Sequence, residues 1–134
     1  MEEPLSPQVL VGARLNLGAL LLRLNKLAEA SEVTSAVTRH APEVLLGWYN
    51  LGLIQRKAGD IAGAIEAYEN GLQLNPDSPE LHQNLGAAQL AGGNFETARS
   101  SFLMAIGLLL QQNRKADAEA LARSAGELVN LNAA

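Results

Sequence analysis

The chain of 134 residues contains no cysteine. A disulfide framework and thiol chemistry are therefore excluded, and the redox compartment stays undetermined. Aromatic residues are also scarce, at 4% of the sequence, although hydrophobic residues make up 48%. A core must therefore be built from Leu, Ala, Ile and Val, which suits helices that pack closely through small residues.

Runs of one kind of residue are missing as well. The net charge is −4, with no run of Lys or Arg, so we do not expect nucleic acid as a partner. The richest apolar run, residues 15–24, is interrupted by Asn16 and Arg23 and is too short to span a bilayer. Residues 1–4 are acidic where a secretory signal would be basic. We therefore expect a soluble, cytoplasmic protein without membrane insertion, with one domain spanning residues 1–134.

Candidates for chemistry are few. The two histidines, His40 and His82, are far apart, and neither has a His or a carboxylate at metal-ligand spacing. The sequence holds no paired carboxylates in its body, no nucleophile motif and no nucleotide fingerprint. We therefore predict that the protein is not an enzyme and has no metal site and no cofactor. His40 is predicted at the surface, at a helix end, and His82 as a partly buried packing residue.

What the sequence does contain is a repeat with a period of 34 residues. The tripeptide at residues 50–52, Asn-Leu-Gly, recurs at residues 16–18 and again at residues 84–86. Other positions recur in the same register: Ala30, Ala64 and Ala98; Tyr68 and Phe102; Pro42 and Pro76; Gly59 and Gly93. A fixed period of this length is typical of stacked repeat architectures.

This pattern resembles the tetratricopeptide repeat (TPR) family, whose unit is a helix–turn–helix. The middle repeat carries the family motif as Trp48, Leu51, Gly52, Ala64, Tyr68 and Pro76. The chain departs from the motif at several positions: Gln55 and Gly71 in the middle repeat, His82 and Leu110 in the third, and Thr34 in the first. The resemblance covers residues 11–112. It implies an all-α, right-handed α-solenoid of three repeats, at about 11–44, 45–78 and 79–112.

Seven helices follow from the periodicity and from the residues that start and stop helices. We predict them at residues 7–24, 27–39, 43–57, 61–73, 79–91, 95–112 and 114–131. Ser6 and Ser78 each precede a proline and should cap a helix, as should Asp60 and Asn94. Gly59 should take the left-handed conformation after the third helix.

Glycines 18, 52 and 86 lie inside helices, where glycine costs about 1 kcal/mol relative to alanine. We expect each of them to face an alanine of the following helix, Ala30, Ala64 or Ala98, and so to let the two backbones approach.

The seventh helix lies beyond the last repeat, and the family implies a capping role for it. Its apolar stripe, which includes Leu121, Ala125 and Leu128, should cover Ile106 and Leu109. The alternative is that this stripe serves another subunit.

In the family, the first helix of each repeat lines a concave groove. The resemblance therefore implies a protein or peptide partner bound in the groove. The candidate binding residues on those faces are Asn16, Asn50, Asn84, Leu15, Ala19, Arg23, Tyr49, Leu53, Arg56, Lys57, Gln83 and Ala87.

Three of these residues are asparagines at one register position, although asparagine is a poor helix former. An amide can donate and accept hydrogen bonds, so this asparagine ladder (Asn16, Asn50 and Asn84) could bind the main chain of a peptide. The alternative is that the three asparagines brace the neighbouring repeat.

The sequence thus predicts a non-catalytic adaptor or scaffold that binds a partner segment. The apolar contacts would come from Leu15, Leu22, Tyr49 and Leu53. The cations Arg23, Arg56 and Lys57 would favour an acidic residue. The alternatives are a structural protein that self-associates as a homo-oligomer, and an assembly chaperone within a larger complex.

Overall fold

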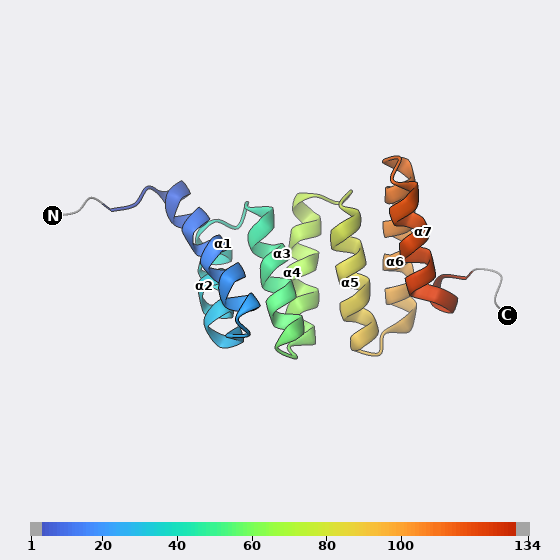
Figure 1. Ribbon diagram of the computed structural model, residues 1–134, viewed down its shortest axis with the longest axis horizontal. Coiled ribbons are helices and arrows are strands. Elements are labelled where there is room, and N and C mark those ends of the chain that lie inside the picture. The colour runs from blue at the N-terminus through green and yellow to red at the C-terminus, as the bar shows by residue number, and fades with distance from the viewer. Residues whose placement is uncertain (1–3, 131–134) are drawn as a thin grey trace. The chain divides into compact units, whose positions relative to one another are not determined.

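A computed structural model describes residues 4–130, which form α-helices and one short 3-10 helix, with no strand in that range (Figure 1). The helices are α1 (Pro7–Arg23), α2 (Leu27–His40), α3 (Leu45–Lys57), α4 (Ile61–Leu74), α5 (Pro79–Ala91), α6 (Phe95–Gln111) and α7 (Lys115–Ala125), followed by η1 (Gly126–Val129). The predicted all-α class is confirmed. No helix among the described residues is long and apolar enough to cross a membrane.

The chain divides into two compact units, Met1–Ala67 (unit 1) and Tyr68–Ala134 (unit 2), and α4 contributes residues to each. Unit 1 contains α1, α2 and α3, which pack against one another. In unit 2, α6 packs against both α5 and α7. A single domain with repeats at 11–44, 45–78 and 79–112 stays a prediction.

Polar side chains start three of the helices as predicted. Ser6 Oγ accepts a hydrogen bond from the N–H of Val9 at 3.3 Å, and Ser78 Oγ accepts one from Leu81 at 3.2 Å. Asp60 Oδ1 accepts one from the N–H of Gly63 at 2.9 Å. The prediction for Asn94 is wrong, because its side chain makes no capping hydrogen bond.

The turns that end α1, α3, α5 and α6 share one hydrogen-bond pattern. A left-handed residue stands in each turn: Asn25, Gly59, Gly93 or Asn113. The following N–H then reaches back five residues, as from Asp60 to the carbonyl of Gln55 at 2.8 Å. This is a Schellman motif, which satisfies helix-end carbonyls that would otherwise lack partners. Gly59, with φ of 90°, adopts the conformation predicted for it.

The core of unit 1 is small and aliphatic. Leu21, Ala30 and Ile54 are buried together, with Leu22 and Val33 packed at their edge. The expectation that Gly18 faces the side chain of Ala30 is wrong, because the nearest side chain is that of Thr34. A Cβ at Gly18 would overlap with Thr34 Oγ1, whereas Ala30 contributes only a carbonyl oxygen at 3.9 Å. The glycine therefore makes room for the residue at the aromatic register position.

Unit 2 repeats this arrangement with a larger side chain. A Cβ at Gly86 would lie 3.0–3.1 Å from ring atoms of Phe102, so this glycine also faces the aromatic position rather than Ala98. The buried core of the unit comprises Ala98, Phe102, Ala105, Leu109, Ala118 and Leu121.

Helix α7 covers α6 as predicted, and Ile106, Ala125 and Leu128 pack at the edge of this core. The prediction of one helix over residues 114–131 is wrong in length. Gly126, at φ 56° and ψ −133°, ends α7, and the chain continues as η1. Residue 131 lies outside the described residues.

Trp48 and His82 occupy the same register position in successive repeats and make the same hydrogen bond. Trp48 Nε1 donates to the carbonyl of Pro42 at 2.8 Å, and His82 Nε2 lies 2.8 Å from the carbonyl of Pro76. His82 is half-buried, as predicted. Each ring therefore ties the start of a helix to the proline that precedes it.

Candidate functional site

The predicted groove residues of unit 1 lie on α1 and α3, which contact each other. Their exposure falls into two classes. Asn16, Ala19, Arg23, Arg56 and Lys57 are exposed, whereas Leu15, Tyr49, Asn50 and Leu53 are half-buried. The surface thus combines accessible polar groups with apolar side chains that are only partly covered.

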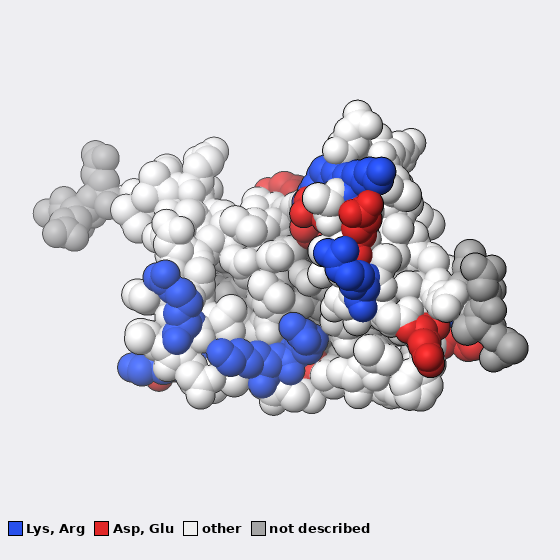
Figure 2. Space-filling view, turned by 45° about the vertical axis from the view of Figure 1, so that its right-hand side comes forward, with Lys and Arg blue, Asp and Glu red and all other residues white. Residues whose placement is uncertain are grey.

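Part of this set meets in one pocket of about 350 Å³, lined by Leu22 and Arg23 of α1 and by Leu53, Arg56 and Lys57 of α3. We call it the basic pocket. All five lining residues were predicted from sequence to contact a ligand. Figure 2 shows Lys and Arg side chains gathered along the lower left of the surface.

The basic pocket carries positive charge without a counter-charge. Of the residues that line it, none is acidic, and none of its three cations forms an ion pair within the described part of the chain. All three cations lie in the last turn of their helices, where the helix dipole is negative and favours them. Two half-buried leucines, Leu22 and Leu53, line the same pocket. The arrangement suits an anionic group attached to an apolar segment.

Unit 2 has a pocket of about 340 Å³ whose arginine is already paired. Gln83 lines it together with Glu80, Arg114 and Asp117. Arg114 donates to Glu80 at 2.6 Å and to Asp117 at 3.0 Å. The hydrogen bond to Glu80, followed by that to Asp117, raises the pKa of Arg114 above its ordinary value. Basic and acidic side chains stand beside one another at the upper right of Figure 2.

Sequence reasoning missed this ion pair, although a signal was present. Glu80 and Arg114 carry opposite charges and are separated by one repeat period. Residues one period apart occupy equivalent places in adjacent repeats, so opposite charges at that spacing are candidates for an ion pair.

The two remaining predicted residues of unit 2 are less accessible. Ala87 packs against the core of the unit, which leaves it little surface for a ligand. Asn84 is half-buried, and its Nδ2 is buried without a hydrogen-bond partner among the described residues. Because a buried donor without a partner is costly, Nδ2 is a group that a ligand atom could satisfy. The asparagine ladder extends over both units and stays a prediction.

Metal chemistry finds no support in the described part of the chain. No group of three His, Asp or Glu side chains there is placed to hold an ion. His40 is exposed at the end of α2, as predicted.

Two family models match the sequence. A tetratricopeptide repeat model matches residues 11–33, and a TPR repeat model matches residues 52–93. Both matches fall inside the range predicted from the repeat register. Among curated proteins, protein FlbA of Caulobacter vibrioides is 36% identical over 83 residues, which is 62% of this chain and 14% of FlbA. The chain covers 9–14% of the length of the three curated relatives it matches.

Solved structures share the fold over most of the chain. PcrH of Pseudomonas aeruginosa has a TM-score of 0.79 at 23% identity, over 95% of this chain and 93% of PcrH. SycD of Yersinia enterocolitica, a type III secretion chaperone solved with a peptide of the translocator YopD, has a TM-score of 0.73 at 18% identity, over 93% of this chain and 100% of SycD. These similarities confirm the predicted fold class.

Proposed function

The chain is a tetratricopeptide-repeat protein, and from this premise we propose that it binds a segment of another protein through the basic pocket of unit 1. The occupant is an extended or helical segment that carries an acidic residue beside an apolar one. The protein thus acts as an adaptor, a scaffold or an assembly chaperone, and not as a catalyst.

One observation carries this proposal: three cations that form no ion pair among the described residues line one pocket together with two half-buried leucines. Exposed cations that form no ion pair are available to a ligand at little cost, because no internal contact has to be broken. Charge-assisted hydrogen bonds to a carboxylate are about twice as strong as neutral ones. Leu22 and Leu53 add apolar area that a bound segment would remove from water.

Structures with the same fold support a peptide ligand. PcrH has been solved with the chaperone-binding region of PopD, and SycD with a peptide of YopD. Both resemble this chain at 20% identity or less, so the partner proposed here is defined by its chemistry rather than by theirs.

We include the asparagine ladder in this proposal, as the group of side chains that binds the main chain of the segment. Asn16 is exposed on α1, about two helical turns before Arg23, and Asn50 is half-buried on α3. An amide can pair with both the N–H and the C=O of a peptide main chain, whatever the side chains of the peptide. Asn84 Nδ2 would find its missing acceptor in the same way.

The proposal is tested by affinity purification of partners from a cell extract, quantified by mass spectrometry. The parent chain is compared with the double variant Arg56→Gln and Lys57→Gln. Arg39→Gln serves as the control, because Arg39 is also exposed in the last turn of a helix of unit 1 but lies outside the basic pocket.

A partner of the proposed kind is recovered by the parent and by the control and depleted about five- to thirtyfold with the double variant, since two lost exposed charge pairs of about 0.5–1 kcal/mol each give that factor. Equal recovery with all three chains rules out the basic pocket. Comparable thermal melting of the three chains shows that any loss reflects binding rather than unfolding.

A second candidate function, self-association, is favoured by the surface of α1. Val9, Leu17, Leu20 and Leu24 are exposed along α1 and just beyond its end. Together with Ala13 they are spaced four, four, three and four residues apart and so share one helix face. Sedimentation velocity over a hundredfold range of concentration tests this. A mass that rises with concentration in the parent, but not in Leu17→Gln with Leu20→Gln, supports a homo-oligomer.

A further inference from the structure

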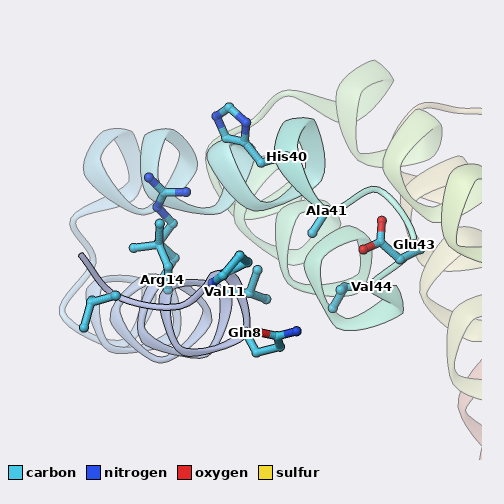
Figure 3. A pocket seen from close by; sticks show the side chains of 10 residues that line it. Gln8, Val11, Arg14, His40, Ala41, Glu43 and Val44 are labelled. Carbon is cyan, nitrogen blue, oxygen red and sulfur yellow. The ribbon is translucent and has the colours of Figure 1, made fainter. Parts of the chain in front are cut away.

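Unit 1 contains a second and larger pocket, of about 600 Å³, which we call the end pocket. It is formed by the first half of α1, the end of α2 and the connection to α3 (Figure 3). It shares no lining residue with the basic pocket or with the predicted groove set. A function assigned to it therefore goes beyond the groove function proposed above.

The end pocket lies where the chain enters α3. The sequence predicts the third helix from residue 43, but α3 begins at Leu45, after the connection 41–44. Val44 lies one repeat period before the capping residue Ser78, and no side chain caps α3. Val44 N–H instead bonds to the carbonyl of Ala41 at 3.1 Å, and both residues line the pocket. The wall of the pocket is thus apolar where the following repeat has a polar cap.

Charge is distributed unevenly around this wall. Figure 3 shows Arg14 and His40 on one side of the pocket, Glu43 on the other, and Val11, Ala41 and Val44 between them. Within the described part of the chain, none of the three polar residues forms an ion pair. Basic residues therefore line the pocket from α1 and α2, and an acidic residue lines it from the connection.

We infer that the end pocket docks a segment of a partner protein in which an apolar side chain stands between an acidic and a basic residue. The apolar side chain covers Val11 and Val44, the acidic residue meets Arg14 and His40, and the basic residue meets Glu43. A ligand with a single charge would pair with the basic residues or with Glu43, but not with both. A segment of several residues can reach both ends, which a compact small ion cannot.

The test uses acetylated, amidated hexapeptides titrated into the ¹⁵N-labelled full chain, followed by amide chemical shifts. The first peptide has a central pair of leucines, a glutamate at one end and a lysine at the other. In the acid-only peptide glutamine replaces the lysine, and in the base-only peptide glutamine replaces the glutamate. In a fourth peptide serines replace the leucines. Sodium octanoate is titrated separately as a small apolar carboxylate.

The expected result has two parts. The two-charge peptide shifts the amides of Val11, Ala41 and Val44 and binds more tightly than either single-charge peptide, while the serine peptide leaves these amides unchanged. Arg14→Gln weakens the two-charge and acid-only peptides by about two- to fivefold, the effect of one exposed charge pair, and spares the base-only peptide. Glu43→Gln does the converse. Arg39→Gln, the control outside the pocket, changes none of them.

Several outcomes overturn the inference. If octanoate binds at these amides and no peptide does, the pocket belongs to a small carboxylate. If the shifts fall instead on Leu53 and Lys57, the peptides use the basic pocket and the end pocket is not a docking site. Absence of binding by every probe also rejects it. An unchanged amide spectrum of each variant outside the pocket shows that the variant is folded.

Discussion

Each unit has a pocket that includes residues at helix ends. The two units differ in whether the cations of that pocket are paired and in how their apolar helix faces are covered. In unit 2, Arg114 is held by Glu80 and Asp117, and α7 covers the apolar side of α6. In unit 1, Arg23, Arg56 and Lys57 have no acidic neighbour in their pocket, and α1 exposes a row of large apolar side chains. The arginine of the unit 2 pocket is thus already paired, whereas the cations of the basic pocket form no ion pair among the described residues.

This difference bears on function because a side chain that already forms an ion pair within the protein is less available to bind a ligand. A ligand carboxylate at Arg114 would have to compete with two carboxylates already bound there. At the basic pocket it would meet only water. We therefore expect an acidic ligand to bind at the basic pocket rather than at the pocket of unit 2.

Removing the closure of unit 2 should have the largest effect. Deleting residues 113–134 uncovers Leu109, Phe102 and Ile106, which pack with α7. Exposing a few hundred Å² of apolar surface, at about 25 cal/mol per Å², costs on the order of several kcal/mol as an upper bound. We expect a much lower melting temperature and concentration-dependent association. A truncated chain that stays monomeric with unchanged melting would show that α7 is not a cap.

Two leucine substitutions test the difference in burial between α7 and α1. Leu121 of α7 is 6% exposed, whereas Leu20 of α1 is 43% exposed. Leu121→Ala should lower the free energy of unfolding by about 2–5 kcal/mol, because it leaves a cavity in the core of unit 2. Leu20→Ala should change it by less than about 1 kcal/mol. Denaturant unfolding of both variants measures the two changes in the free energy of unfolding. Similar decreases in the two variants would mean that the exposed face of α1 is also covered.

The asparagine ladder gives the next prediction. Asn50→Ala with Asn84→Ala should weaken partner binding by about ten- to a hundredfold, because each amide contributes about 0.5–1.5 kcal/mol through its hydrogen bonds. Stability should hold or rise, since alanine is the better helix former and Asn84 Nδ2 has no partner to lose among the described residues. Reduced melting with unchanged affinity would assign these residues to bracing the repeats.

A smaller effect on stability is expected from removing a hydrogen bond that both units contain. Trp48→Phe removes the hydrogen bond to Pro42, and His82→Phe removes the one to Pro76. Each change should cost about 0.5–1.5 kcal/mol of unfolding free energy, the usual net value of one such bond. Thermal unfolding checks both. A loss in one variant only would show that the two rings are not equivalent.

Much of the fold follows from residues with strong local preferences. Ser6 and Ser78 before prolines, Asp60, and glycines at Gly59 and Gly93 set helix boundaries that the structure reproduces. These preferences act within a few residues and do not depend on distant packing. The recurring apolar positions then identify which helix faces pack together.

The errors occur where two local tendencies conflict or where packing decides. The helical spacing of Leu128 and Val129 continues past Gly126, but the backbone of that glycine ends α7, and both side chains reach the core from η1. Gly18 and Gly86 face the aromatic register position rather than alanine because of how the helices approach one another. Sequence spacing alone does not determine that approach.

The candidate site is predicted in part. The five residues of the basic pocket were identified because they lie at equivalent ends of α1 and α3. The end pocket was missed because it depends on how the connection 41–44 runs between the end of α2 and the start of α3. The paired state of Arg114 was missed because it depends on a contact between residues one repeat apart.

The most direct test of the basic pocket is a double-mutant cycle with a partner recovered by affinity purification. Lys57→Gln is combined with neutralisation of each acidic residue of the bound segment, one at a time, and affinities are measured by isothermal titration calorimetry. A pair in direct contact should show a coupling energy of about 0.5–1 kcal/mol for one acidic residue, and none for the same residue against Arg39→Gln. Additive effects at every acidic position would contradict binding of an acidic segment in the basic pocket.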